Sequence, residues 1–600
     1  MVAKGINSVL FIILLPVYCL RLNLFVMRTK TQQICTIIAC LLASYYLQAE
    51  GTLDRISTSV FQAQCANAGC HTGSSPAAGL NLQTTGATLR NSLYNVNSSN
   101  AVSQAAGNMV VFPGHPYRSK LFLLINNGLA ADAVLLPDED PGNIHASLNL
   151  SDLDKELIRQ WILFDSPVSG EAVSHSMLET FYGGNGIWAT DPAAPPAKPA
   201  PGEGFQIHLG PIFLPPWEGA DQPDEEYHYK YATLLPENIE ITRLEGNIGS
   251  SHHMILYRYN NTANAATLPY GLQQTGMTGG RSMVAAFGQS STVDLPGGTA
   301  FKWYEGSFID VNTHVVNYSP TAVLATDVFI NVYTQPFGTA AQEMKTTLLI
   351  NPAIFILYNN GVQTFTDDVR NVAGLPATYY VWKMSSHTHR HGQSFNVWRR
   401  NADGAKGEHL YNANKYNGIP ECEEIGYDYQ HPPARTFENY LPVVNSEGLI
   451  QEATFINNDV QPWITWGETV NDEMMITGIF YLDNVTGVEP PDGSVCFADE
   501  INTGLNLNPS ASPLQLSAAI APNPAQGIAQ LHLTSAGHTT ANFVLTDLAG
   551  RELLHINHIQ LQEQQPEVRL LDLNGLAAGM YLYRVTGSNG LGTSGKLLVK

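Results

Sequence analysis

The chain has 600 residues, with 30 Lys and Arg against 52 Asp and Glu, and its formal net charge is −22. A chain of this length is too long for one hydrophobic core, so it predicts several domains. The negative charge disfavours nucleic acid as a partner, because phosphate binding needs the opposite sign.

Residues 1–49 form a predicted targeting region with two apolar stretches, 9–26 and 34–47, separated by Arg28-Thr-Lys30. Met27, the basic pair and the second stretch are typical of a secretory signal peptide cleaved after Ala49, with Met27 as the true start. The alternatives are a membrane anchor through the first stretch and a lipid-modified Cys40. In an oxidising compartment Cys422 and Cys496 can pair as a disulfide, if their Cα atoms are close enough.

Residues 51–168 are predicted to form a small helical domain. Ser151 is a helix N-cap with Asp154 three residues on, and an apolar stripe follows at Leu153, Leu157, Ile158, Trp161 and Ile162. Earlier lies Cys65-Ala-Asn-Ala-Gly-Cys70-His71, a longer variant of the CxxCH motif that attaches c-type haem. The alternative interpretations are a disulfide in a loop and half of a zinc site.

This segment resembles the cytochrome c domains attached to extracellular bacterial enzymes. The similarity lies in the Cys-Cys-His, in the Pro-Gly-x-Pro-x-x-Ser-x-Leu run at 113–121, and in the closing helix. It implies one covalently bound haem c, held by Cys65 and Cys70, with His71 as an iron ligand. Such domains usually carry a Met-Pro that supplies the sixth ligand, where this chain has Leu136-Pro137. The substitute is His115, Met109 or His145, or the iron is five-coordinate.

A Pro/Ala-rich stretch within residues 169–204 is predicted to be an extended linker. From Phe205 to Asn484, short alternating apolar runs are punctuated by Gly, Pro and Asn, which is typical of antiparallel β-sandwiches. The length predicts two of them, 205–341 and 342–485, dividing near Gln342.

Four segments in this β-rich region carry candidate copper ligands. In order they are His252-His253, Thr-His314-Val, His387-Thr-His389 and Asn-Asp-Glu-Met474. Imidazole binds copper in both oxidation states and a thioether favours Cu(I), so the mixture suits a redox-active ion. Adjacent side chains on a strand point to opposite faces, so His252 and His253 share one ion only if the strand kinks or ends there. His391 shares a face with His387 and His389 and competes with Met474 as third ligand.

The order of these motifs resembles the copper type II, ascorbate-dependent monooxygenases, the family of the peptide-amidating and dopamine β-hydroxylating enzymes. The resemblance implies two jelly-roll-type sandwiches facing across a solvent-filled cleft. It implies one electron-transfer copper on His252, His253 and His314, and one oxygen-binding copper on the catalytic set His387, His389 and Met474. The implied reaction hydroxylates a C–H bond of an organic substrate with O2 and two electrons, from ascorbate, a redox protein or the fused haem domain.

The substrate is not identified by the sequence. Peptide-amidating members bind the peptide carboxylate with an Arg and a Tyr at the positions of Ser385 and Gly478 here. Peptide amidation is therefore disfavoured, and a different small or medium organic substrate is expected. The alternative function is a secreted haem and copper protein that transfers electrons or holds copper without hydroxylating anything.

A spacer is predicted at 486–516 and a last β-rich module at 517–600. This module resembles the C-terminal sorting domain of the type IX secretion system, in Pro522-Asn-Pro524, Asp547-Leu-Ala-Gly550, Gly579-Met-Tyr and Lys596-Leu-Leu-Val. The alternative is an ordinary immunoglobulin-like accessory sandwich. The resemblance implies export by the type IX machinery to the cell surface or the medium.

Overall fold

The structure is a computed structural model that describes residues 50–496 and 516–599. Short gaps fall at 68–69, 218–223, 234, 260–264, 275–279, 289–291, 318, 460, 468–470, 536–538, 547–550, 563–566 and 588–591. The predicted targeting region, with Cys40 and Ala49, and residues 497–515 of the predicted spacer lie outside the described residues. The chain divides into two compact units, Met1–Ala498 and Asp499–Lys600. Its fold is mainly β with several antiparallel sheets, and none of the described helices is long and apolar enough to cross a membrane.

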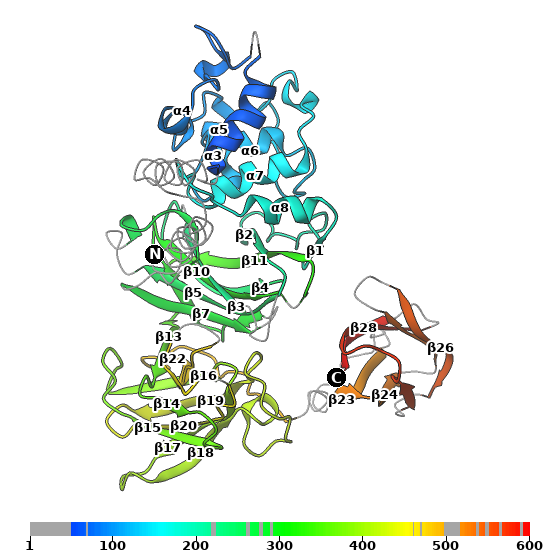
Figure 1. The fold of residues 1–600 in the computed structure, drawn as a ribbon. Coiled ribbons are helices and arrows are strands. Elements are labelled where there is room, and N and C mark those ends of the chain that lie inside the picture. The colour runs from blue at the N-terminus through cyan, green and yellow to red at the C-terminus, as the bar shows by residue number, and fades with distance from the viewer. Residues whose placement is uncertain are drawn as a thin grey trace, which may run out of the picture. The chain divides into compact units, whose positions relative to one another are not determined.

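Helices dominate the first part of unit one (Figure 1). They are α3 (Thr52–Arg55), η1 (Ile56–Cys65), α4 (Gly86–Leu93), α5 (Ala101–Ala105), α6 (Lys120–Ile125), α7 (Asp152–Leu163) and α8 (His175–Tyr182), with short turns η2 (Ala77–Gly79), η3 (Pro116–Arg118) and η4 (His145–Ser147). The Ser151 side chain accepts a hydrogen bond from the Asp154 backbone N–H, as the predicted cap requires. Trp161 and Ile162 of α7 lie fully buried in the core of this helical domain.

The extended stretch is shorter than the predicted linker 169–204. Helix α8 and strand β1 (Gly186–Trp188) lie within residues 169–204, and β1 pairs in parallel with β11 (Val323–Pro336). Leu178 and Phe181 of α8 are buried in the core of the helical domain, so this segment has an apolar face that must be covered. The longest run within it without helix or strand is 189–203.

Two sheets follow that enclose one hydrophobic core. The first has the order β1-β11-β4-β9-β12, with β2 on β11 and β8 on β4, and the second has the order β6-β3-β10-β5-β7. Their bounds are β2 (Gly204–Leu214), β3 (Asp224–Ala232), β4 (Ile239–Asn247), β5 (Ser251–Tyr259), β6 (Gly271–Gln273), β7 (Arg281–Gly288), β8 (Thr292–Asp294), β9 (Thr299–Trp303), β10 (Phe308–Val316) and β12 (Gln342–Glu343). Leu244 and Ile330 from one sheet pack with Leu256 and Val311 from the other.

Two further sheets begin immediately after β12. One has the order β13-β22-β16-β19 and the other β15-β20-β17-β18, with a β14-β21 pair beside them. Their bounds are β13 (Lys345–Ile350), β14 (Phe355–Leu357), β15 (Gln363–Val369), β16 (Thr378–His387), β17 (Gly392–Arg400), β18 (Lys406–Asn412), β19 (Ala434–Val444), β20 (Leu449–Phe455), β21 (Trp463–Thr465) and β22 (Ile476–Leu482). Val381 and Ile479 share a buried core with Phe395 and Ala453. The change of sheet at Met344 lies close to the predicted division at Gln342.

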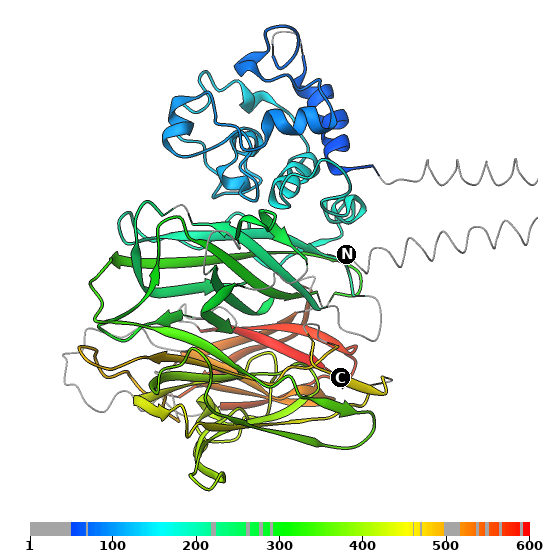
Figure 2. The ribbon, with the colours of Figure 1, turned by 90° about the vertical axis from the view of Figure 1, so that its left-hand side faces the viewer.

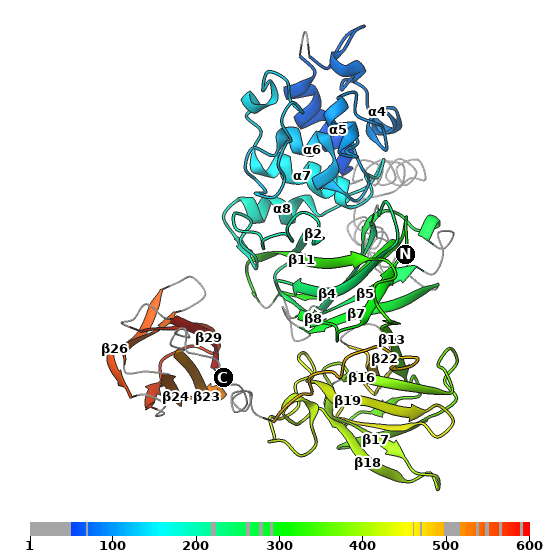
Figure 3. The same cartoon turned by 180° about the vertical axis from the view of Figure 1, so that it is seen from behind.

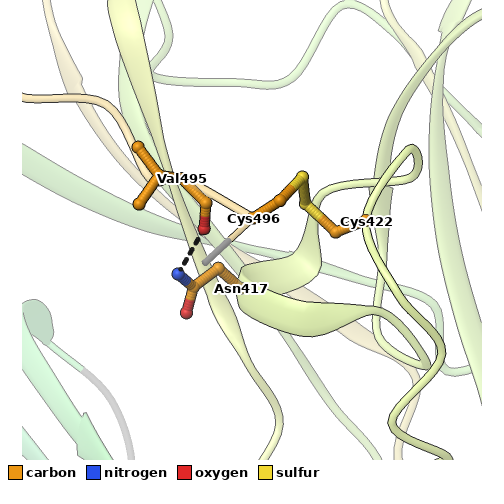
Figure 4. The surroundings of a disulfide bond; sticks show 4 residues. All are labelled: Asn417, Cys422, Val495 and Cys496. Atoms are coloured by element: carbon orange, nitrogen blue, oxygen red, sulfur yellow. Dashed lines mark hydrogen bonds between the residues drawn. A yellow bond between two sulfur atoms is a disulfide. The ribbon is translucent and has the colours of Figure 1, made fainter. Parts of the chain in front are cut away.

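A disulfide joins Cys422 to Cys496, with the two Cα atoms 5.1 Å apart, which confirms the predicted pairing (Figure 4). Beside it, the Asn417 side-chain amide donates a hydrogen bond of 2.9 Å to the Val495 carbonyl. The chain as far as Cys496 is therefore fastened to the second pair of sheets.

The second unit is a compact β module. Its strands are β23 (Leu516–Gln526), β24 (Ile528–Ser535), β25 (Thr539–Thr546), β26 (Glu552–Leu561), β27 (Glu567–Asp572), β28 (Gly579–Gly587) and β29 (Gly592–Val599), in the order β26-β25-β28-β29-β23-β24-β27. Strands β23, β24, β26 and β29 are labelled in Figure 3. Leu531, Leu533, Phe543 and Leu545 alternate into its core, as the sequence pattern predicts.

The helical domain packs against the first pair of sheets (Figure 2). Phe213 of β2 and Ala325 of β11 belong to the core of the helical domain. Between the two parts lies the buried side chain of His208, whose Nδ1 is 2.8 Å from Asp132 and whose Nε2 is 2.9 Å from Asp327. Burial alone would lower the pKa of His208, but the hydrogen bonds to both carboxylates raise it above its ordinary value.

The raised pKa gives the docking of the helical domain a pH dependence. A group with a raised folded-state pKa stabilises the fold fully below about pH 6.5, and that contribution is lost as pH rises through the folded-state pKa. We expect the melting temperature of the full chain to fall across this alkaline window. In H208Q the slope should be smaller but not zero, because His228 and His391 also have raised pKa values. The stability at pH 6 should be lower by about 3 kcal/mol, because two buried carboxylates lose their cation. The matched control H555Q, at an exposed His of the second unit, should keep the wild-type slope; equal slopes in all three proteins would refute the expectation.

Candidate metal centre

A cavity of about 540 Å³ lies between the β3-β10-β5-β7 sheet and the β13-β22-β16 sheet. Strands β7 and β13 adjoin here, and the Thr346 hydroxyl donates a hydrogen bond to the Met283 carbonyl. The cavity lining includes four of the predicted copper ligands: His253, His314, His387 and Met474. Residues from both predicted ligand sets therefore line one space.

The first ligand set lies on two neighbouring strands. His253 of β5 is the cross-strand partner of His314 of β10, and their ring centroids are 4.3 Å apart. The register shifts between His314 and Val315, because Ser251 pairs with Val315 and His252 is left as an extra residue in β5. Such a bulge breaks the strict alternation of a strand and re-aims side chains. Strand β5 thus has the irregularity that His252 and His253 need if they are to bind one ion. The side chain of His252 lies outside the described part of the structure.

The second ligand set lies where β16 ends. His387 is the last residue of β16, and the ring of His389 in the following loop lies 5.1 Å from that of His387. The ring of His387 also contacts that of His253, at 4.8 Å. Four imidazoles therefore form a continuous row, His314, His253, His387 and His389, and the two predicted copper sites adjoin. The cavity lies beside these rings, between the two pairs of sheets; a solvent-filled cleft between two coppers stays a prediction.

The hydrogen bonds of His389 fit a metal ligand. Its Nδ1 donates to the Asp472 carbonyl at 3.1 Å, which assigns the proton to Nδ1 and the lone pair to Nε2. Nε2 is buried and has no hydrogen-bond partner among the described residues. A metal-binding His typically donates its second nitrogen to an oxygen in this way, so the donor set suits copper.

Glu473 holds the two loops of the second ligand set together, and the sequence motif did not single it out. Its side chain is fully buried and accepts hydrogen bonds from the backbone N–H groups of His389, at 2.8 Å, of His391, at 2.7 Å, and of Met474, at 3.2 Å. The only signal in the sequence is its place beside Met474. A carboxylate is buried at low cost only when such donors surround it.

His391 is not placed as a ligand. Its Nδ1 lies 3.2 Å from Glu473 and its Nε2 lies 3.0 Å from Asp459, so carboxylates engage both ring nitrogens. Burial would lower the pKa of His391, but these hydrogen bonds raise it above its ordinary value. Strand alternation does not extend to His391, because β16 ends at His387 and β17 begins at Gly392. Of the two candidates for the third ligand, Met474 is the one that lines the cavity.

A second polar network lies behind His314. Its Nε2 is 3.1 Å from the Glu226 carboxylate, which also receives a 2.8 Å hydrogen bond from Asn312 and lies 3.3 Å from His228. His228 in turn contacts Asp310, at 3.1 Å. Burial would raise the pKa of Glu226, but the hydrogen bonds from His228 and His314 bring it well below its usual range. This anion orients the His314 ring, so that Nδ1 carries the lone pair.

The candidate haem site lies at the end of η1. The backbone N–H of His71 donates to the Cys65 carbonyl at 3.3 Å, so the loop returns His71 to Cys65. Both cysteines are thiols, and burial, with Cys70 nearby, raises the pKa of Cys65 to about 11. His71 Nδ1 lies 3.2 Å from the Leu80 carbonyl. Burial, the largest influence, lowers the pKa of His71 and so favours the neutral imidazole that binds iron.

One of the candidate sixth ligands, His115, lies elsewhere. His115 is buried against Tyr231 and Phe112, with ring centroids at 4.9 and 4.5 Å, and burial lowers its pKa to about 3. It belongs to the contact between the helical domain and β3. The backbone of Met109 pairs with that of Arg118 and Lys120. Leu136 is exposed.

Among the described residues, no group of three or more His, Cys, Asp and Glu side chains has a metal-binding arrangement. The predicted copper sets differ from such groups, because one contains a thioether and the other contains His252.

Comparison with known proteins identifies the C-terminal module. Residues 519–600 match the family described as Secretion system C-terminal sorting domain. The chain is a secreted or cell-surface protein, and its sorting domain implies interaction with the type IX secretion machinery. No curated protein matches the chain.

Similarity to solved structures is weak. The CARDB domain of the PF1109 protein from Pyrococcus furiosus is 14% identical, with a TM-score of 0.12, covering 14% of this chain and 93% of that one. Latent PorU from Porphyromonas gingivalis is 12% identical, with a TM-score of 0.14, covering 61% and 34%. Parabacteroides merdae β-glucuronidase is 7% identical, with a TM-score of 0.14, covering 45% and 31%. The chain thus spans about a third of the latter two proteins, and scores this low support no conclusion about function.

The role of Glu473 can be measured with two variants. E473A leaves buried N–H donors without an acceptor, so we expect a loss of about 3 kcal/mol of stability and of the metal site beside it. E473Q keeps the size and part of the hydrogen bonding and should lose less. The measurements are thermal unfolding and copper content, with E452Q on the exposed side of β20 as the matched control. Full copper content in E473A would show that Glu473 does not shape the site.

Proposed function

We propose that the chain is a secreted copper-dependent monooxygenase that hydroxylates a C–H bond of an organic substrate with O2. The observation that carries the proposal is one cavity that His253, His314, His387 and Met474 line, with the ring of His389 next to that of His387. Three imidazoles and a thioether on two different pairs of sheets have no packing reason to converge on one cavity.

His252, His253 and His314 would hold one copper, and His387, His389 and Met474 the other. When bound, the copper pair supplies the two electrons by which one oxygen atom of O2 enters the substrate and the other becomes water. The protein residues fix this arrangement. Glu226 orients the ring of His314, and Glu473 with the Asp472 carbonyl orients His389.

The helical domain suits the role of a built-in electron donor. It is attached to the first pair of sheets through buried contacts of His208, and the Tyr229 hydroxyl of β3 donates a hydrogen bond to the Gly114 carbonyl. The same strand carries Glu226 and His228, which line the copper cavity. The domain that would carry the haem on Cys65, Cys70 and His71 therefore contacts a strand that lines the copper cavity, and ascorbate is the alternative donor.

The cavity wall next to the second copper site favours an anionic substrate. Ser385 pairs with Gly478 across β16 and β22, so small residues line the wall between His387 and Lys383, about 13 Å apart along the strand. Among the described residues the Lys383 ammonium has no hydrogen bond or ion pair, and the Trp382 ring lies 5.5 Å away. Burial lowers the pKa of Lys383. An ammonium in this setting is stabilised by a carboxylate or similar anion.

Copper stoichiometry and turnover test the proposal together. Copper-loaded wild type should hold two coppers per chain and consume O2 in step with a hydroxylated product, screened among organic acids. H389A should lose one copper and at least 100-fold in turnover, while its haem spectrum stays unchanged. The control H409Q, at a His stacked on Trp398 outside the cavity, should behave as wild type. One or no copper in the loaded wild type would exclude the two-copper mechanism and favour an electron-transfer function.

The anion preference is testable without copper. We expect 4-phenylbutanoate to bind copper-free protein at least tenfold more tightly than its uncharged amide, measured by calorimetry. K383M should abolish the difference and K383R should keep most of it. K406M, at an ion-paired Lys on β18, is the matched control. Equal affinity of acid and amide for wild type would reject Lys383 as an anion site.

A further inference from the structure

Two histidines of the helical domain face each other across a short distance. His71 follows the second cysteine of the haem motif, and His145 opens η4, more than 70 residues later. Their ring centroids are 6.3 Å apart and their planes differ by 28°. No hydrogen bond joins the two rings in the described structure, so a direct contact does not account for this separation.

Each ring is anchored through the same nitrogen. His71 Nδ1 lies 3.2 Å from the Leu80 carbonyl, and His145 Nδ1 lies 2.9 Å from the Asp140 carboxylate, which also accepts from the His145 backbone N–H at 3.1 Å. An oxygen acceptor at Nδ1 assigns the proton to that atom and the lone pair to Nε2. Both histidines therefore present Nε2 as the ligand nitrogen.

The separation fits two imidazoles on one metal ion. A ligand nitrogen lies about 2.0–2.1 Å from a metal and about 1.1 Å from its own ring centroid, so two rings on opposite sides of one ion have centroids about 6.3 Å apart. We infer that His145 is the sixth ligand of the haem iron, opposite His71. This rests on the haem attachment of the proposed function and is independent of the copper site.

The segment that leads to His145 supports the assignment. Val134 is 67% exposed and Ile144 is 65% exposed, and Leu136 between them is 43% exposed. Apolar side chains gathered on one short surface segment mark a surface that a ligand covers, and a porphyrin face beside His71 is such a ligand. His115 lacks this setting, because it packs against β3. Met109 has its backbone paired with residues 118–120, and its thioether is the rival that the test below decides on.

Ligation by two imidazoles would lower the reduction potential of the haem iron. A thioether ligand raises the potential of haem iron, so replacing it by His145 lowers that potential. A haem held by His71 and His145 would be the stronger reductant and would suit a one-electron donor to the copper site.

The test is optical spectroscopy of the full chain in its copper-free form. Wild type should carry one covalent haem by the pyridine assay, with a low-spin spectrum in both oxidation states and no CO binding when reduced. H145A should become high-spin and bind CO, and H145M should return to low spin with a higher reduction potential. M109L and H115Q are the matched controls and should keep the wild-type spectrum.

The inference is overturned if H145A stays low-spin and refuses CO, or if M109L or H115Q gives the change instead. Absence of covalent haem from the purified chain overturns both this inference and the haem donor. A failed copper reconstitution changes none of these spectra, so the two proposals fail separately.

Discussion

The arrangement of the second ligand set depends on one buried carboxylate. Glu473 is fully buried and accepts backbone hydrogen bonds from His389, His391 and Met474. Because a buried anion is tolerated only when donors surround it, the two loops can vary little in relative position. The geometry of the His-x-His segment is thus imposed by a contact between residues more than 80 positions apart, and not by strand alternation.

Sequence patterns identified the features that depend on local order. Alternating apolar residues indicated the sheets, the Ser151 cap indicated α7, and the motif order placed His253, His314, His387 and Met474 in what proved to be one cavity. Contacts between distant strands carry no such signal. Hence Glu473, the Glu226 network and the carboxylate partners of His391 were missed, and the amphipathic α8 was hidden beside a Pro/Ala-rich stretch.

Strand β3 links the two regions to which we assign redox chemistry. Alternate residues point to opposite faces of a strand. Glu226 and His228 face the copper cavity, while Tyr229 and Tyr231 contact Gly114 and His115 of the helical domain. The first pair of sheets therefore contacts the helical domain and also forms a wall of the cavity, and a substitution on β3 can affect both.

The Cys422–Cys496 disulfide fixes the C-terminal segment of the first unit, two residues before that unit ends at Ala498. Any force on the chain from the sorting domain during export acts on this covalent bond before it reaches β22. Removal of the residues after Cys496 would likewise leave the cavity intact, because Cys496 stays bonded to Cys422 in the second pair of sheets. The disulfide thus holds the end of the first unit in place independently of the chain that leads to the sorting domain.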